Sequence, residues 1–260
     1  MQDTESFWYL GGNDFPDETA VTDTIYFNTS AQIHRKEGLP MSKGRQSHCA
    51  LNVKMDFAPF NKSQNQVWVI GGVNALTTVE TYCQKQTGVN EEICSHDQDG
   101  LHWSPVTNLN EARDGHTCTA FHHKEHGLAI LVAYGHSSLE AEIFLIEECS
   151  NCIDPDCVFK CSWQLELDGI GLEGQSPKRY DSKMVTLNGI PTIFGGASTE
   201  TDEELNQVIM FRDVSPSDDS RTNYWELVSH TVSSRQRHTV VSVPLSFICA
   251  EDAVTTSTTR

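Results

Sequence analysis

The sequence lacks any apolar run long enough to cross a membrane as a helix. Its longest apolar stretch, residues 128–134, has the length of a β-strand and falls far short of the roughly 18 residues that such a helix needs. Basic residues are also scarce, because 18 Lys and Arg stand against 36 Asp and Glu, for a formal charge of −18. This charge repels nucleic-acid phosphates, so we expect no nucleic-acid binding and regard a basic protein as the easier partner.

Several signatures of catalysis are missing as well. The chain contains no Gly-x-Ser-x-Gly elbow, no phosphate-binding glycine loop and no His-Glu-x-x-His motif. We therefore predict no catalytic residue, no cofactor and no bound metal. The cluster of His122, His123 and His126 beside Glu125 allows a metal hypothesis, but histidines on a polar hairpin are more typical of a solvated surface.

Composition and cysteine content bound the class of protein. Hydrophobic residues make up 38% and charged residues 21% of the 260 residues, enough for one large all-β domain or two average domains. The start MQDTESFWYLGG has neither the basic residues nor the apolar core of a secretion signal. Nine cysteines, with glycosylation sequons at Asn28 and Asn61, nevertheless favour a secreted or extracellular glycoprotein. The missing signal then implies a truncated gene model, a mature fragment or a piece of a larger ectodomain. A cytoplasmic protein with free thiols is the alternative.

An internal repeat with a period of about sixty residues dominates the sequence. Strand-like apolar runs end in a glycine pair at Gly11-Gly12, Gly71-Gly72 and Gly195-Gly196, and Tyr134-Gly135 replaces the pair once. An aromatic residue in a short apolar run follows each turn: Tyr26, Tyr82, Phe144 and Phe211. A tryptophan comes next in three of the four units: Trp103, Trp163 and Trp225.

A polar turn then leads into a further strand-like run in every unit. These turns begin at Arg45, Arg113, Arg179 and Arg235. They end at His48, His116, Ser182 and His238. The order of landmarks resembles the kelch repeat, in which an Arg/His turn opens the innermost strand, the second strand ends in Gly-Gly, and the third and fourth carry Tyr and Trp. Tyr134-Gly135, Ser182 and the missing first tryptophan depart from that pattern.

The resemblance spans residues 7 to about 243 and implies an all-β fold, a kelch-type β-propeller of four-stranded blades whose wedges are filled by aromatic side chains. We predict one domain over residues 1–248, with units near 7–47, 48–115, 116–180 and 181–237. A closing strand over 238–243 would complete the first unit, and residues 249–260 form a tail. Kelch propellers usually have more than four blades, so the alternatives are a small or open assembly, or part of a longer protein.

Six cysteines fall in loops between third and fourth strands, and we predict that they form disulfides: Cys83, Cys94, Cys149, Cys152, Cys157 and Cys161. We pair Cys83 with Cys94. For the other four, two disulfides are favoured over a four-thiolate zinc site, because all four lie within thirteen residues. Cys49 and Cys118 open neighbouring inner strands and either pair or serve as buried apolar residues.

Two sets of residues are candidates for binding. The recurring arginines could ring a central channel and bind an acidic ligand, but recurrence favours a structural role in which each braces its own turn. Acidic loops after two glycine turns form a candidate rim for a basic partner: Asp14, Asp17, Glu18, Glu200, Glu203 and Glu204. We therefore predict a non-catalytic protein–protein interaction module. The alternative is a propeller enzyme or small-ligand binder, oxidase-like or sugar-modifying, with its site at the channel.

Overall fold

The chain folds into antiparallel β-sheets. The computed structural model describes residues 6–14, 19–20, 24–28, 34–37, 40–57, 62–84, 101–137, 141–146, 162–166, 178–212 and 224–237. Every element in these ranges is a β-strand, which confirms the predicted all-β class. In the same ranges there is no helix with the length and apolarity to span a membrane.

Four sheets carry the fold, and we number them in chain order. The first sheet has three strands, β1 (Ser6–Leu10), β4 (Thr24–Asn28) and β5 (His34–Glu37). The second contains β6 (Cys49–Phe57), β7 (Lys62–Ile70), β8 (Val79–Gln84) and β9 (Leu101–Val106). The third contains β10 (Thr117–His123), β11 (Gly127–Ala133), β12 (Ala141–Leu145) and β13 (Gln164–Glu166). The fourth contains β15 (Lys183–Leu187), β16 (Ile190–Phe194), β18 (Gln207–Arg212) and β19 (Tyr224–His230).

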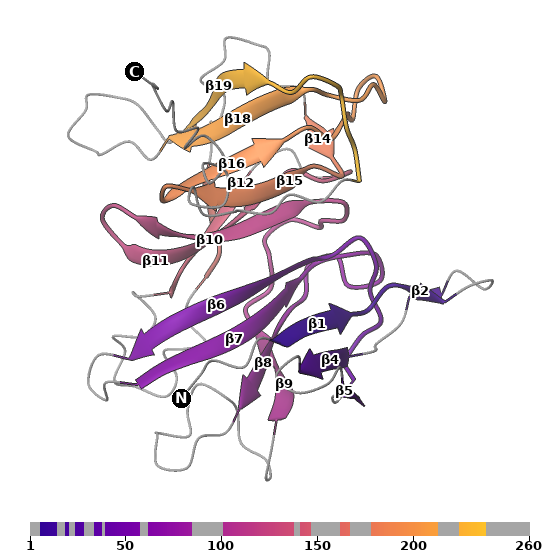
Figure 1. The fold of residues 1–260 in the computed structure, drawn as a ribbon, viewed down its shortest axis with the longest axis vertical. Coiled ribbons are helices and arrows are strands. Elements are labelled where there is room, and N and C mark those ends of the chain that lie inside the picture. The colour runs from indigo at the N-terminus through magenta and orange to yellow at the C-terminus, as the bar shows by residue number, and fades with distance from the viewer. Residues whose placement is uncertain are drawn as a thin grey trace, which may run out of the picture.

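Two short ribbons project beyond the sheets on the same side of the molecule (Figure 1). One pairs β2 (Asn13–Asp14) with β3 (Thr19–Ala20), and the other pairs β14 (Arg179–Tyr180) with β17 (Ala197–Ser198). Strands β2, β3 and β17 follow glycine turns and lie between the second and third strands of their units. Strand β14 lies in the Arg179 turn, before the inner strand β15.

The sheets succeed one another along the long axis of the molecule, with the first and second at one end and the fourth at the other (Figure 1). The innermost strand β10 contacts both β6 and β15, which sets the order of the second, third and fourth sheets. The first and fourth sheets lie at opposite ends, so the described sheets do not close into a ring. The closing strand predicted over residues 238–243 lies outside the described part of the chain.

Apolar side chains fill the space between successive sheets. Successive residues of a strand point to opposite faces, and the third sheet is buried on both faces because it is flanked by two others. Ile130 and Val132 pack with Trp68 and Ile70 of the second sheet. On its other face, Leu131 and Ile143 pack with Ile193, Ile209 and Phe211 of the fourth.

The recurring aromatic and tryptophan landmarks meet in pairs on neighbouring third and fourth strands. The ring centroids of Tyr82 and Trp103 lie 5.0 Å apart, and those of Phe211 and Trp225 lie 5.3 Å apart. Phe144 and Trp163 form the equivalent pair in the third sheet, at 5.2 Å. Tyr26 belongs to β4, where its backbone pairs with Trp8 of β1. Each of the three ring pairs contributes about 0.5–1.5 kcal/mol beyond the stabilisation that comes from burying the rings.

A disulfide joins Cys49 of β6 to Cys118 of β10, whose Cα atoms lie 6.0 Å apart. This bond settles the choice that the sequence left open for these two residues, and it ties the second sheet to the third. Of the six loop cysteines, only Cys83 lies in a described strand, where its backbone pairs with His102. Cys94, Cys149, Cys152, Cys157 and Cys161 lie outside the described residues, so their pairing stays a prediction.

Candidate interaction face

The glycine turns repeat in backbone conformation. The first residue of each pair has a left-handed φ: 60° at Gly11, 58° at Gly71, 61° at Tyr134 and 56° at Gly195. Tyr134 therefore departs from the repeat in sequence but not in conformation. A non-glycine residue there costs roughly 1–2 kcal/mol. Its buried ring packs 5.8 Å from that of Trp225, an interaction that offsets part of this cost.

Backbone hydrogen bonds link each sheet to the next turn. The amide of the second glycine donates to the carbonyl of the arginine that opens the next turn, from Gly12 to Arg45, Gly72 to Arg113, Gly135 to Arg179 and Gly196 to Arg235, at 2.7–3.0 Å. The packing leaves no room for a side chain at Gly72, Gly135 or Gly196, where an added Cβ would lie 2.7–2.8 Å from a backbone carbonyl oxygen. A Cβ on Gly72 would lie 2.7 Å from the Gln46 carbonyl oxygen and 2.8 Å from His48 Cβ.

The third residue of every arginine turn also repeats. Ser47, Gly115, Asp181 and Arg237 all have a left-handed φ, between 50° and 62°. The Gly115 amide donates to the Ser47 carbonyl at 2.9 Å, and the Asp181 amide donates to the Gly115 carbonyl at 2.7 Å. The Arg237 amide donates to the Asp181 carbonyl at 3.1 Å. We call this row of backbone bonds the turn ladder.

Three of the four recurring arginines are buried inside their sheets. The side chains of Arg45, Arg113 and Arg179 are 0% exposed. Each donates from Nη1 to the carbonyl of the first residue of its own glycine turn, which is Gly71, Tyr134 or Gly195, at 2.9–3.1 Å. Burial lowers the pKa of Arg45 and of Arg179. Arg235, in contrast, is exposed.

The buried arginines meet acceptors on the third strand that the sequence pattern did not identify. Arg45 pairs with Glu80 of β8, and Arg113 Nε donates to Glu142 Oε1 of β12 at 2.9 Å. Arg179 instead donates to the amide oxygen of Gln207, at 2.7 Å. A signal was present, because Glu80 and Glu142 each stand two residues before the recurring aromatic in otherwise apolar runs.

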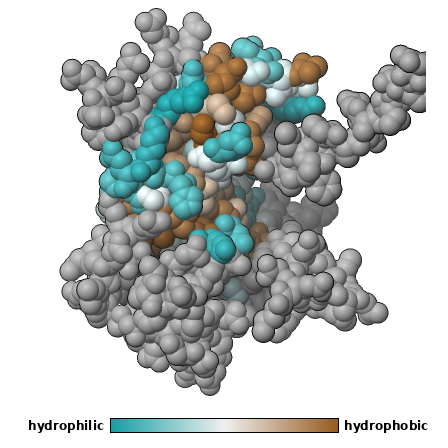
Figure 2. All heavy atoms as spheres, turned by 60° about the vertical axis from the view of Figure 1, so that its left-hand side comes forward, coloured by the Kyte–Doolittle hydropathy of each residue, from teal (hydrophilic) through white to brown (hydrophobic). Residues whose placement is uncertain are grey.

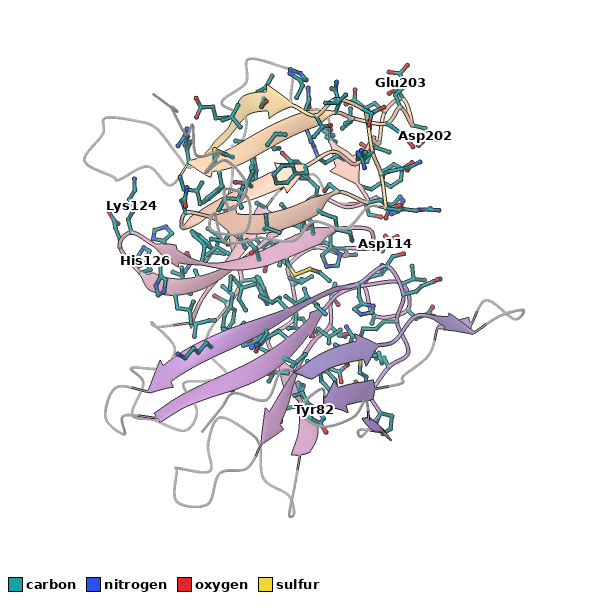
Figure 3. All side chains as sticks on the ribbon, viewed as in Figure 1. Tyr82, Asp114, Lys124, His126, Asp202 and Glu203 are labelled. Atoms are coloured by element: carbon teal, nitrogen blue, oxygen red, sulfur yellow. A yellow bond between two sulfur atoms is a disulfide. The ribbon has the colours of Figure 1, made fainter. Side chains whose placement is uncertain are left out.

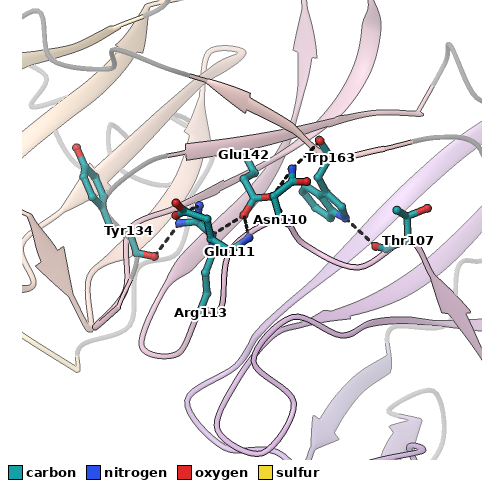
Figure 4. Close-up of polar contacts among 7 residues, drawn as sticks. All are labelled: Thr107, Asn110, Glu111, Arg113, Tyr134, Glu142 and Trp163. Atoms are coloured by element: carbon teal, nitrogen blue, oxygen red, sulfur yellow. Dashed lines mark hydrogen bonds and ion pairs between the residues drawn. The ribbon is translucent and has the colours of Figure 1, made fainter.

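Glu142 is the centre of a buried polar network between the second and third sheets (Figure 4). Besides the Arg113 bond, its carboxylate accepts hydrogen bonds from the amides of Asn110, at 2.7 Å, and Glu111, at 3.3 Å. Asn110 also reaches the carbonyl of Trp163, whose indole donates to the Thr107 carbonyl at 2.9 Å. The loop before the Arg113 turn is thereby fixed against the third sheet.

His48, His116 and Ser182 stand immediately before the inner strands β6, β10 and β15. His116 and Ser182 are buried, and His48 is half-buried. The His116 ring packs against Gly71, since a Cβ there would lie 2.7 Å from His116 Cε1. Burial, reinforced by the Arg113 charge, lowers the pKa of His116 to about 3. Burial and the Arg45 charge lower the pKa of His48 to about 4. Both rings are therefore neutral near pH 7. His238 lies outside the described residues.

Exposed and half-buried side chains gather where the turns meet. His136 stacks on Tyr180 with ring centroids 4.1 Å apart, and its Nδ1 lies 2.9 Å from Asp114 Oδ2. The Tyr180 hydroxyl donates to Asp202 Oδ1 at 2.8 Å, a bond that raises the pKa of Tyr180. Arg237 pairs with Asp181 at 2.9 Å. We define the turn face as Asp114, His136, Tyr180, Asp181, Asp202 and Arg237.

The predicted acidic rim is partly at this face. Glu200, Glu203 and Glu204 are exposed on the connection after β17, beside Asp202. Backbone bonds fix that connection, with Asp202 donating to the Ser198 carbonyl and Ser198 to the Glu203 carbonyl, both at 2.9 Å. Asp14 lies in the β2 ribbon. Asp17 and Glu18 lie outside the described residues.

The histidine cluster lies at the other end of the sheets. Figure 3 places Asp114, Asp202 and Glu203 on the right-hand side, and Lys124 and His126 on the left-hand side, where the strands have their other ends. The rings of His123 and His126 lie 4.7 Å apart, and His122 is exposed. Within the described ranges, no three His, Cys, Asp or Glu side chains are grouped so that they could hold a metal ion.

Comparison with known proteins gives little beyond this geometry. No protein-family model matches the chain, and no curated protein matches it. The solved structure of YjhT is similar to 80% of this chain, with 13% sequence identity and a TM-score of 0.43. The matched part is 52% of the YjhT chain, so this chain spans about half of that protein's length.

Proposed function

We propose that the chain is a non-catalytic protein-interaction domain of the kelch-propeller type, and that its turn face binds a basic segment of a partner protein. The observation that carries the proposal is the gathering of Asp114, Asp202 and the stacked His136–Tyr180 pair on one face, from separate turns. The repeated glycine and arginine turns support the kelch-type architecture. The Cys49–Cys118 disulfide supports an oxidising, extracellular location.

The turn face is suited to recognition because a rigid frame holds its exposed and half-buried side chains. The three bonds of the turn ladder fix the backbones of four successive turns, so the side chains they carry keep their relative positions. Rigid scaffolds that present variable loop residues are where binding usually occurs. The neighbouring Glu200, Glu203 and Glu204 add negative charge, and the Tyr180 ring offers a surface on which an arginine guanidinium can stack.

The alternative of an arginine ring that binds an acidic ligand finds less support. Arg45, Arg113 and Arg179 are 0% exposed, and their guanidinium groups donate to carbonyls of their own sheets. A ligand at the surface could not reach these donors without opening the sheets. Their position favours the role of bracing the turns.

Binding of a fluorescently labelled, arginine-rich peptide tests the proposal. We expect fluorescence anisotropy to show binding that weakens as salt is added, because the attraction is between exposed charges. Asp202→Asn and Tyr180→Ala should each weaken it several-fold. The control Glu125→Gln removes the same charge at the opposite end and should leave binding unchanged. Equal losses for Asp202→Asn and Glu125→Gln would show a diffuse effect of net charge and contradict the proposal.

A further inference from the structure

The turn ladder has two different ends. Its three bonds leave the Ser47 amide at one end and the Arg237 carbonyl at the other, each without a ladder partner among the described residues. One end therefore offers a donor and the other an acceptor. A bond from the Ser47 amide of another molecule to the Arg237 carbonyl would continue the row in the same donor-to-acceptor direction.

The Arg235 turn makes the backbone bond of the repeat but lacks, within the described ranges, a sheet that buries its side chain. Its carbonyl accepts the Gly196 amide at 2.7 Å, just as the other three arginine carbonyls accept theirs. Its side chain is exposed, however, whereas the other three are 0% exposed in the sheet that follows them in the chain. In the described part of the chain, no sheet follows Arg235. The turn is thus in place for a further sheet that would bury its guanidinium.

At the opposite end of the molecule, the first sheet has no inner strand and no bracing arginine among the described residues. Strand β1 precedes a glycine turn, as β7, β11 and β16 do. Those three strands pair with the inner strands β6, β10 and β15, while β1 pairs only with β4 within the described residues. The Gly11 carbonyl also occupies the position at which Gly71, Tyr134 and Gly195 receive an arginine side chain. The first sheet can therefore accept an inner strand and an arginine.

The outward face of the fourth sheet is only partly covered. On the third sheet, Ala133 and Ile143 face the next sheet and are 0% and 1% exposed. The corresponding residues of the fourth sheet, counted from the glycine turn and the aromatic, are Phe194 and Met210, and both are partly exposed. Figure 2 shows apolar residues at the surface of the upper end, where Figure 1 places the fourth sheet.

We infer that these two ends are the two halves of one sheet–sheet junction, and that a second copy of this chain docks there. The Arg235 turn of each copy lies on the Gly11 turn of the other, with its guanidinium bonded to that glycine carbonyl. Two head-to-tail junctions related by a two-fold axis close the assembly and leave no free end. Closure within one chain is disfavoured, because the first and fourth sheets lie at opposite ends of the molecule. The ring would have about eight sheets, within the range of known propellers.

The mass in solution tests this inference. Sedimentation velocity or light scattering at about 100 µM protein should give about twice the 29.0 kDa chain mass. Each copy carries a charge of −18, so added salt should strengthen the association by screening repulsion. This salt response is opposite to that expected for peptide binding at the turn face, so the two proposals fail or succeed separately.

Substitutions then locate the contact. Arg235→Ala should weaken dimerisation roughly 100- to 10,000-fold, because a hydrogen bond from a charged group, worth about 10- to 100-fold, is lost at each of the two junctions. Met210→Glu, on the outward face of the fourth sheet, should do the same. Lys124→Ala removes an equal charge from an exposed hairpin of the third sheet and should have no effect. Circular dichroism checks that each variant is folded. A monomer at high salt, or dimerisation unchanged in both Arg235→Ala and Met210→Glu, would overturn the inference.

Discussion

Replacing Glu142 by alanine should weaken the junction between the second and third sheets more than any exposed substitution. Its carboxylate is 0% exposed and accepts hydrogen bonds from Arg113 Nε, the Asn110 amide, Asn110 Nδ2 and the Glu111 amide, at 2.7–3.3 Å. Alanine would leave the buried Arg113 guanidinium without this carboxylate and leave a cavity in the network. Removing one partner of a buried ion pair costs about 3–5 kcal/mol.

The free energy of unfolding, measured from urea titrations of the oxidised protein, gives the size of the effect. A loss of about 3–5 kcal/mol corresponds to a fall of roughly 6–20 °C in Tm for a chain of this size. The matched control is Glu226→Ala, because Glu226 also pairs with an arginine, Arg212, but these two side chains are 42% and 37% exposed. An exposed pair contributes at most about 1 kcal/mol. If Glu142→Ala cost no more than Glu226→Ala, our account of the junction would be wrong.

A conservative variant separates charge from shape. Glu142→Gln keeps the volume of the side chain but removes the negative charge that faces Arg113, and it turns an NH₂ group toward donors. We expect a loss of about 1.5–3 kcal/mol, the range for hydrogen bonds to charged groups. A glutamine variant as stable as the wild type would show that the network depends on shape alone.

Three further predictions concern pH, the disulfide and the glycine turns. His116 and His48, whose pKa values are lowered to about 3 and about 4, stay neutral in the folded chain while the unfolded chain binds protons below about pH 6.5. The free energy of unfolding should therefore fall as the pH drops from about 6.5 toward 4. His116→Asn should make this fall less steep in urea midpoints measured at several pH values. An unchanged pH dependence would count against a buried neutral ring. Replacing Cys49 and Cys118 together by alanine should cost about 4 kcal/mol, because the bond closes a loop with a sequence separation of 69, and peptide mapping of the unreduced wild type should recover the linked pair. Gly72→Ala should cost more than about 2 kcal/mol through steric overlap at a φ of 98°. Gly189→Ala, with a φ of 81° and no atom within 4 Å of the added Cβ, should cost only about 1 kcal/mol, and equal costs in thermal melts would refute the overlap argument.

Much of the scaffold can be predicted from the sequence because its requirements are local. A turn with positive φ selects glycine, so the recurring pairs at Gly71 and Gly195 mark the ends of strands in the sequence itself. Short apolar runs of strand length between these marks indicate the all-β class. Tyr134 is the instructive exception, because its conformation is imposed by the hydrogen bonds and ring packing around it rather than by its own preference.

The site is harder to predict because its contacts join distant positions. Glu142 lies 29 residues from Arg113, and neither spacing nor residue type alone identifies that pair. The sequence leaves the Cys49–Cys118 bond open for the same reason, since spacing does not fix connectivity. On the turn face, His136, Tyr180 and Asp202 come from different turns and stand outside the recurring landmarks, so only the folded chain brings them together.

The turn ladder has a consequence for how such a surface can evolve. The residues at its four positions are Ser47, Gly115, Asp181 and Arg237, which differ in size, charge and polarity. The ladder uses only their main-chain atoms, so exchanging the side chain at Ser47, Asp181 or Arg237 leaves the bonds between turns in place. Gly115 is more restricted, because an added Cβ would lie 2.7 Å from the His136 ring and that ring would have to move. Mutation can therefore change the chemistry of the face one position at a time, from acidic to basic or from bulky to bare, while the sheets beneath keep their register.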